Sequence, residues 1–275
     1  MVERVTITLK HDMLKRIDRM VDKRSIRNRS HAIETLLSKA FTRTGMDTAL
    51  ILAGGEGISL RPITYEIPKP LIPINGRPIL EHQIRMLKKY DITNLVISVG
   101  YMKEKVIEHF GNGSKFGVNI EYITEDRPSG TAGCLKPAKD FIKNSFIMLN
   151  VDTLVNPDIY EMHEFHKREK RLATVLLSTS PDTKNFGVAV MRGNSVVKFS
   201  EKPAKSRSNI INAGMCIFEP EVPDFVTRQK FMIEELFSRL SRENQLSGYV
   251  YDGIVLDAGT HDGYERAIKT LKEMK

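Results

Sequence analysis

The 275-residue chain has only two cysteines, Cys134 and Cys216, which lie far apart and lack the spacing of a metal site. This argues against a disulfide framework and favours a reducing compartment, the cytoplasm. The chain also lacks any run of 18 or more apolar residues, and its first ten residues are polar at every second position. We therefore expect neither a membrane-spanning helix nor a signal peptide, and no membrane partner.

Positive charge is concentrated at the N-terminus. The whole chain carries a net charge of +8. Residues 1–45 hold eleven lysines and arginines against five acidic residues, so three quarters of the excess lies in the first sixth of the chain. Such a stretch is either a solvated basic face or a nucleic-acid contact surface, and charge alone does not decide between them.

The pattern of the first 45 residues is more specific. Val5, Ile7 and Leu9 alternate with polar residues, which predicts a strand with one buried face. Two amphipathic helical patterns follow, for which Asp12 and Ser30 are the expected N-caps. About 40 residues bury too little surface to fold alone, and a lone strand must pair with another. Two copies of the chain would solve both problems.

This strand-helix-helix arrangement, over about residues 2–41, resembles the ribbon-helix-helix (Arc/MetJ-type) DNA-binding family. The resemblance implies a domain over residues 1–43, a homodimer or higher even oligomer, and double-stranded DNA as a partner. The alternative is a dimerisation module without a role in DNA binding. By position, the resemblance assigns DNA contacts to Arg4, Thr6, Thr8, Asn28 and Ser30.

A glycine-rich loop follows the apolar run 49–52. It contains Gly54, Gly55 and Gly57, and glycines allow backbone N–H groups to approach phosphates closely. Lys69 comes twelve residues later between two prolines, which restrict where its ammonium group points. A glycine loop and a restrained lysine together predict a polyphosphate-binding site. The loop is neither a dinucleotide fingerprint nor a Walker A motif, because Pro62 interrupts it and no Gly-Lys-Ser/Thr follows.

From residue 47 onward, apolar strand patterns alternate with amphipathic helical patterns, which predicts an α/β domain with a mostly parallel sheet over residues 47–275. Strands are expected at 49–52, 95–99, 120–123, 146–150 and 173–177. Helices are expected at 79–90, 104–110, 133–141 and 158–170, and an amphipathic stretch at 264–271 should pack back on the core. Gln83 and Lys136 are expected to be surface helix positions.

Six motifs occur in the order and approximate spacing of the sugar-1-phosphate nucleotidyltransferases, nearest the mannose-1-phosphate guanylyltransferase branch. The first is the stretch that contains the glycine loop and Pro-Lys-Pro, and the other five are Gly130-Thr131-Ala132-Gly133, Asn150-Val151-Asp152, Glu201-Lys202-Pro203, Asn212-Ala213-Gly214 and Asp257-Ala258-Gly259-Thr260. The resemblance implies a Rossmann-like nucleotidyltransferase domain with a mixed, mostly parallel sheet. It further implies that an NTP, with GTP favoured, reacts with a sugar 1-phosphate to give an NDP-sugar and pyrophosphate.

Carried over by position, the resemblance also assigns roles to individual residues. The catalytic set is Lys69, Asp152, Lys202 and Asp257, of which Asp152 and Asp257 are the expected Mg²⁺ ligands because carboxylate oxygens suit that ion. The expected nucleotide-binding residues are Leu52, Ala53, Gly54, Gly55, Gly57, Ser59, Arg61, Glu125, Pro128, Gly130 and Thr131. The expected sugar-binding residues are Gly187, Glu201, Asn212 and Gly214. A carboxylate at Glu125 can accept hydrogen bonds from guanine, and its alternative role is a solvated strand end.

The loop departs from the family pattern Gly-x-Gly-Thr-Arg-Leu, because Ile58 and Ser59 replace the threonine and the arginine. The family arginine grips the triphosphate, and a serine hydroxyl replaces its five donors poorly. Arg61 lies two residues further on and is the nearest substitute. Two hypotheses follow. The chain is an enzyme with a DNA-binding module, or it is a transcription regulator that senses a sugar nucleotide and turns over poorly.

Overall fold

In the computed structural model, residues 5–21, 26–41, 45–125 and 129–273 are described. The chain divides into two compact units, Met1–Arg43 and Thr44–Lys275. Within the described residues, no helix combines the length and apolar character needed to cross a membrane.

The N-terminal unit consists of two helices, α1 (His11–Met20) and α2 (Arg29–Phe41). Buried Ile17 and Ala32 lie one on each helix, and a bidentate ion pair joins Arg29 on α2 to Asp18 on α1, with Nε–Oδ1 at 2.5 Å. Among the described residues, few side chains are buried between the two helices, which agrees with the expectation that so small a unit has little hydrophobic core of its own.

Three expectations for this unit were wrong in detail. Residues 5–10 form no strand, and Val5 and Ile7 are 75% and 52% exposed, because a strand needs a neighbour and the single chain offers none there. The N-cap of α2 is Asn28 rather than Ser30, since the Asn28 Oδ1 accepts a hydrogen bond from the His31 N–H at 2.9 Å. Likewise α1 begins at His11, so Asp12 lies inside its first turn.

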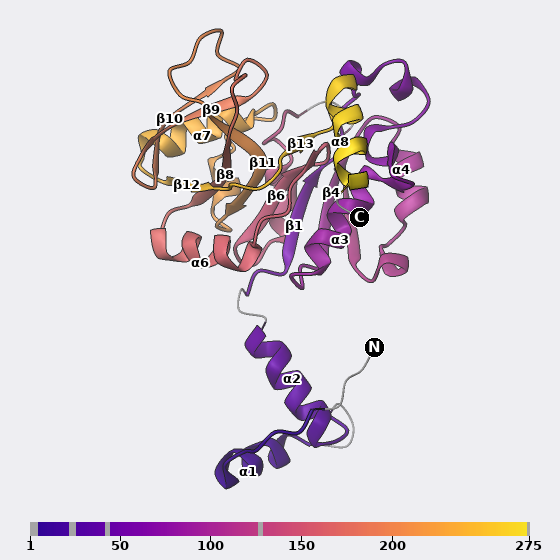
Figure 1. The fold of residues 1–275 in the computed structure, drawn as a ribbon, viewed down its shortest axis with the longest axis vertical. Helices are drawn as coiled ribbons and strands as arrows, with labels where there is room; N and C mark the ends of the chain where they lie inside the picture. The colour runs from indigo at the N-terminus through magenta and orange to yellow at the C-terminus, as the bar shows by residue number, and fades with distance from the viewer. Residues whose placement is uncertain (1–4, 22–25, 42–44, 126–128, 274–275) are drawn as a thin grey trace. The chain divides into compact units, whose positions relative to one another are not determined.

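The larger unit is built on one nine-stranded sheet in the order β5-β4-β1-β6-β11-β8-β12-β10-β9 (Figure 1). The strands of this sheet are β1 (Thr48–Leu52), β4 (Asn94–Val99), β5 (Asn119–Thr124), β6 (Phe146–Asn150), β8 (Ala173–Thr179), β9 (Gly187–Arg192), β10 (Ser195–Glu201), β11 (Ile210–Phe218) and β12 (Leu246–Val250). Two small antiparallel pairs complete the strands: β2 (Pro73–Ile74) with β3 (Arg77–Pro78), and β7 (Thr153–Leu154) with β13 (Leu256–Asp257).

The sheet is mixed rather than mostly parallel. Strands β5, β4, β1 and β6 are all parallel, as expected for strands joined by helical crossovers. From β11 onward the pairings are antiparallel, except for the parallel pair β12 and β8. The mostly parallel expectation was wrong for this half because strands β9, β10, β11 and β12 follow one another with only one helix among them.

The helices in the described residues of this unit overlap the predicted segments to within three residues at each end, except α7, which was not predicted. They are α3 (Ile79–Lys88), α4 (Lys103–Phe110), α5 (Leu135–Ala138), α6 (Ile159–Glu169), α7 (Ile233–Arg242) and α8 (His261–Glu273). The helix expected at 133–141 is only α5 followed by a 3₁₀ turn, Lys139–Phe141. Strand β1 is buried in the middle of the sheet, so the loop that follows it is held at a rigid edge.

Helix α6 buries a histidine without a hydrogen-bond partner. His163 is fully buried, and neither ring nitrogen has a partner among the described residues. Burial, followed by the charges of Lys167 and His166, lowers the pKa of His163 to about 4. Its ring is therefore neutral in the folded protein at neutral pH, whereas the unfolded chain protonates it at about pH 6.5.

We expect His163 to make the fold acid-sensitive. Because the folded state binds fewer protons, the stabilisation is complete above about pH 6.5 and is lost as the pH falls toward 4. Between about pH 7 and pH 5 the free energy of unfolding should drop by about 2 kcal/mol, and His163→Phe should remove this part. Urea unfolding at both pH values measures it, with His109→Gln as an exposed-histidine control. An unchanged pH dependence in His163→Phe would contradict the assignment.

Candidate functional site

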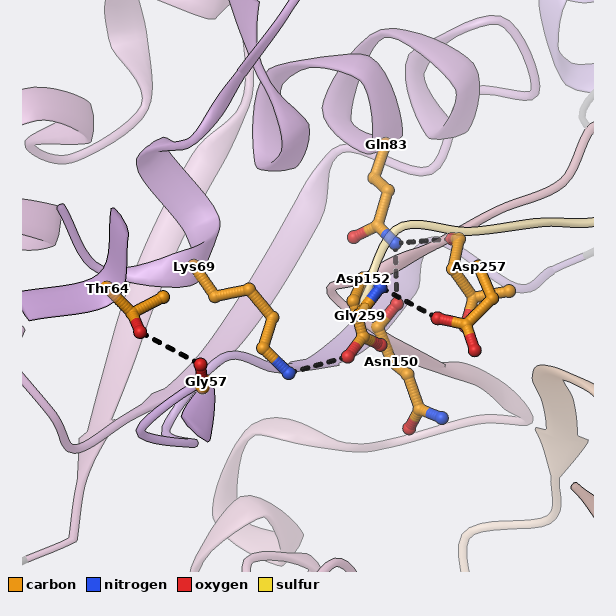
Figure 2. A network of polar contacts seen from close by, with 9 residues as sticks. Gly57, Thr64, Lys69, Gln83, Asn150, Asp152, Asp257 and Gly259 are labelled. Atoms are coloured by element: carbon orange, nitrogen blue, oxygen red, sulfur yellow. Dashed lines mark hydrogen bonds and ion pairs between the residues drawn. The ribbon is translucent and has the colours of Figure 1, made fainter. Parts of the chain in front are cut away.

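The glycine loop and Lys69 lie together at the carboxyl end of β1. Gly57 adopts a left-handed conformation, with φ of +66°, and a Cβ there would lie 2.7 Å from Thr64 Cγ2 and 3.5 Å from Lys69 Cε. The Thr64 hydroxyl donates a hydrogen bond to the Gly57 carbonyl at 2.8 Å (Figure 2). A glycine is therefore required at position 57 both by its backbone conformation and by the closeness of Thr64.

Two carboxylates from distant parts of the chain meet beside this loop. Asp152 lies in the turn between β6 and β7, and Asp257 ends β13, which pairs with β7. A Cβ at Gly259 would lie 2.9 Å from an oxygen of each carboxylate, so both flank this glycine. Lys69 Nζ donates to Asp152 Oδ2 at 2.6 Å, and the Gly259 N–H donates to Asp257 Oδ1 at 2.8 Å (Figure 2).

The electrostatics of the pair reflect a crowded, half-buried site. Burial, followed by the negative charge of Asp152, raises the pKa of Asp257, while the Gly259 N–H and Lys69 act in the opposite direction. Lys69 and Asp152 expose only 17% and 21% of their side chains. Two facing carboxylates with hard oxygen donors fit a Mg²⁺ ion, which would offset their mutual repulsion.

We expect Gly259→Ala to impair the site without unfolding the protein. The added methyl group would be 2.9 Å from both carboxylates, which must separate to admit it. A displacement of this size at a reacting centre commonly costs about 10²-fold in rate. The fall in kcat of Gly259→Ala relative to the native chain, from steady-state kinetics, measures this loss. Gly193→Ala is the opposite control, because Gly193 has φ of +57° and open space around it, so its variant should lose stability and keep its activity.

A cavity of about 310 Å³ opens beside the carboxylates, and it brings the four predicted sugar-binding residues together with Lys202 and Thr131. Its lining includes the predicted residues Thr131, Asp152, Gly187, Glu201, Lys202, Asn212, Gly214 and Asp257. They come from six separate segments of the chain, so the fold assembles this cavity from residues that are distant in sequence. A Cβ at Gly214, which has φ of +71°, would lie 2.6 Å from Thr153 Oγ1, so a glycine is needed there.

Glu234 also lines this cavity, and the sequence patterns did not predict it. It is the second residue of α7, half-buried, and faces the same space as Glu201 and Lys202. Burial raises the pKa of Glu201, with a further contribution from Glu234, and burial also raises the pKa of Glu234. Two carboxylates and a lysine suit a polyhydroxylated anion, because carboxylates accept from hydroxyl groups and the ammonium pairs with the anionic group. No predicted element covers α7, so nothing in the sequence analysis pointed to Glu234.

Glu125, one of the residues predicted to bind the base, has both carboxylate oxygens hydrogen-bonded to neighbouring serines. Its Oε1 accepts from the Ser98 hydroxyl at 2.5 Å, and its Oε2 accepts from the Ser129 N–H and hydroxyl at 3.0 and 2.9 Å. Gly130 has φ of +78°, and Thr131 Oγ1 accepts from the Ile233 N–H, which starts α7. Pro128, like Arg4 in the N-terminal unit, lies outside the described residues.

Ile58 and Ser59, the two residues that depart from the family pattern of the glycine loop, lie on the exposed side of the loop. Ile58 is 63% exposed, and Ser59 is exposed beside it in a 3₁₀ turn. Arg61 NH2 pairs with Glu56 Oε2 at 3.1 Å, and its guanidinium lies 5.1 Å from the centre of the Tyr65 ring. Arg61 thus contacts Glu56 and Tyr65 at the surface of the loop.

Gln83 departs from the surface position expected for it. It is 2% exposed, and its Nε2 donates to the carbonyls of Asn150 and Thr153 (Figure 2). Lys136 is exposed, as expected. The remaining predicted residues, Leu52, Ala53, Gly54 and Gly55, lie at the end of β1 and in the loop that follows it.

Comparisons with known proteins agree with this geometry. The nucleotidyl transferase family model matches residues 48–274. The chain is 37% identical over 218 residues to the mannose-1-phosphate guanyltransferase of Saccharomyces cerevisiae, over 76% of this chain and 60% of that protein. It is 35% identical to the mannose-1-phosphate guanylyltransferase catalytic subunit beta of Xenopus tropicalis, over 77% of this chain and 61% of that protein. The chain thus spans about 60% of the length of these curated relatives.

A solved structure shares the fold. A protein described as a glucose-1-phosphate thymidylyltransferase of Bacillus anthracis, crystallised with sucrose, superposes with a TM-score of 0.78 at 28% identity. The match covers 83% of this chain and 96% of that chain. The family model begins at residue 48, so the assignment of the N-terminal unit rests on its sequence pattern.

Proposed function

The chain belongs to the nucleotidyl transferase family, and from this premise we propose that it is a sugar-1-phosphate nucleotidyltransferase that prefers GTP and mannose 1-phosphate. The observation that carries the proposal is the junction of two half-sites. Lys69 from the glycine loop contacts Asp152, and Asp152 and Asp257 line the cavity that holds Glu201 and Lys202. A polyphosphate site and a polyhydroxylated-anion site therefore share one pair of carboxylates.

In this reaction an oxygen of the sugar phosphate attacks the α-phosphorus of the NTP. A new phosphorus–oxygen bond forms, the α–β bridging bond breaks, and pyrophosphate leaves with the electron pair. The residues around the junction position and neutralise the reactants, and the chain forms no covalent intermediate. Lys69 would contact the NTP-derived phosphates from the loop side, and Lys202 would contact the sugar phosphate from the cavity side.

Asp152 and Asp257 would hold Mg²⁺, which supplies positive charge against the negative charge of the reacting phosphates. The preference for GTP is supported by the names of the relatives and by Glu125, whose carboxylate can accept from guanine N–H groups while Ser98 and Ser129 hold it in place. Glu201, Glu234 and Asn212 would select the sugar through its hydroxyl groups.

Pyrophosphate release by the purified chain tests the proposal. The assay combines Mg²⁺ with each of the four common NTPs and a panel of hexose 1-phosphates. The highest kcat/KM should occur with GTP and mannose 1-phosphate. Turnover with another pair would correct the specificity, and no turnover with any pair would refute the enzymatic proposal.

A second function concerns the N-terminal unit: we propose that a dimer of residues 1–43 binds double-stranded DNA and makes the protein a transcription regulator. Four observations support it: the net positive charge of residues 1–45, the alternation of exposed Val5 and Ile7 with exposed Thr6 and Thr8, the two-helix unit with its small core, and the Asn28 cap at the start of α2. Pairing of residues 5–9 from two chains would bury Val5 and Ile7 and leave Thr6 and Thr8 facing a groove.

Selection of bound fragments from a random DNA library by the full-length chain tests this function. We expect specific, salt-dependent binding that Arg4→Ala weakens without changing the oligomeric state or nucleotide binding. A dimer that selects no sequence would favour a dimerisation module instead. If DNA affinity depends on GDP-mannose, the chain is also a sensor, because a ligand shifts DNA binding only when it binds the two states differently.

A further inference from the structure

Gln83 is an unusual residue for its position on helix α3. The buried face of α3 is otherwise apolar, with Leu80, Ile84 and Leu87 all fully buried, and Gln83 lies among them at 2% exposure. A buried amide is costly unless it is hydrogen-bonded, and an apolar side chain would fill the same space at no such cost. The glutamine must therefore contribute through its hydrogen bonds.

Those hydrogen bonds go to both ends of the turn that carries Asp152. Nε2 donates to the Asn150 carbonyl at 2.7 Å and to the Thr153 carbonyl at 2.9 Å, and these two residues bracket Val151 and Asp152 (Figure 2). Both partners are acceptors, so the amide must present its nitrogen to them. Its Oε1 is then left buried without a partner among the described residues. Two hydrogen bonds to this turn are thus made although one buried polar atom of the same side chain stays without a partner among the described residues.

The same turn is held from two other sides by backbone contacts alone. The Val151 N–H donates to the Leu52 carbonyl at 3.1 Å, next to the glycine loop, and the Ala258 N–H donates to the Asp152 carbonyl at 2.8 Å, next to Asp257. Gln83 adds the side chain that closes the ends of the turn, from a helix that otherwise takes no part in the site. Its two donors come from one rigid planar group, so the separation of the two carbonyls is fixed.

We propose that Gln83 is a positioning residue, which fixes the carboxylate of Asp152 relative to Asp257 by clamping the turn from Asn150 to Thr153. The proposal rests on the proposed function only for its effect on rate; its effect on the carboxylate pair stands independently. A loosened turn lets Asp152 move while the substrate-binding surfaces stay in place. The variant should therefore lose kcat more than it raises KM.

Gln83→Met tests the proposal, because methionine is similar in length and shape and lacks both donors. We expect kcat for pyrophosphate release to fall about 10- to 100-fold, with the KM for GTP and for the sugar phosphate changed by less than about three-fold. Mn²⁺ alone, titrated by electron paramagnetic resonance, should bind several-fold more weakly. Gln245→Met is the matched control, since the Gln245 side chain also bonds to the backbone, with its Oε1 accepting from the Leu172 N–H, but away from this turn.

The results of these experiments distinguish failure of the Gln83 proposal from failure of the proposed function. A folded Gln83→Met protein with native kcat and native Mn²⁺ affinity would overturn the proposal, as would equal losses in Gln245→Met. If Gln83→Met does not fold, Gln83→Glu decides on the same two readouts, because a protonated carboxyl group donates to only one of the two carbonyls. If the native chain releases no pyrophosphate, the proposed function fails, and the Mn²⁺ comparison still decides the role of Gln83.

Discussion

Asp152→Asn is expected to lower kcat for pyrophosphate release by about 10³-fold. Asparagine has nearly the same shape, so the turn and the cavity should persist. The change removes the charge that Lys69 Nζ contacts at 2.6 Å and one of the two carboxylates that flank Gly259. Lys69 would then lose its partner at the junction between the two half-sites, and Mg²⁺ would lose one of its two expected ligands.

The measurement is steady-state kinetics with GTP and mannose 1-phosphate, together with Mn²⁺ titration. Asp224→Asn is the matched control, because Asp224 forms an exposed ion pair with Lys139 and lies outside the site. It should leave kcat unchanged, as expected for a surface ion pair. If Asp152→Asn keeps more than about a tenth of the native kcat, Asp152 does not carry the role assigned to it.

Local patterns predicted the parts of the fold whose cause is local. The parallel strands β1, β4, β5 and β6 were found within about a residue of their ends, since short apolar runs bounded by turns are typical of buried strands. Strands β9 to β12 were not foreseen, and with them the antiparallel half of the sheet. In β9 and β10, exposed residues follow or interrupt the buried ones, so the pattern of these two strands resembles that of a surface segment.

In the site, too, features with a local cause were predicted from the sequence, and features that depend on tertiary packing were missed. Motifs with a local cause, the glycine loop and the strand-end aspartates, were recognisable from spacing, and Asp152, Asp257, Glu201 and Lys202 line one cavity. Glu234 was missed because α7 reaches the cavity only through tertiary packing. Gln83 was taken for a surface residue because its helical pattern is amphipathic, and nothing in the sequence shows that the turn after β6 needs two donors.

Ser59→Arg is expected to raise kcat for pyrophosphate release by about 10²-fold, because the new guanidinium would supply the donors that the loop lacks for the leaving pyrophosphate. The loop can accept the larger residue. Ser59 is exposed in the 3₁₀ turn Ile58–Leu60, and the fully buried Leu60 anchors that turn to the core. Removing one such donor commonly costs about 10² to 10³ in rate, and an introduced arginine should recover the lower part of that range.

Kinetics with GTP and mannose 1-phosphate measure the gain, and Ser114→Arg is the control. Ser114 is also an exposed serine in a 3₁₀ turn, Ser114–Phe116, so its variant adds the same charge away from the loop and should not change kcat. A gain specific to Ser59→Arg would mean that the native loop stabilises the leaving pyrophosphate poorly and that turnover by the native chain is slow for this reason. That property suits a protein whose ligand state is transmitted to a DNA-binding unit. If Ser59→Arg leaves kcat unchanged while the native chain turns over rapidly, the triphosphate is held without this position and the sensor hypothesis loses its main support.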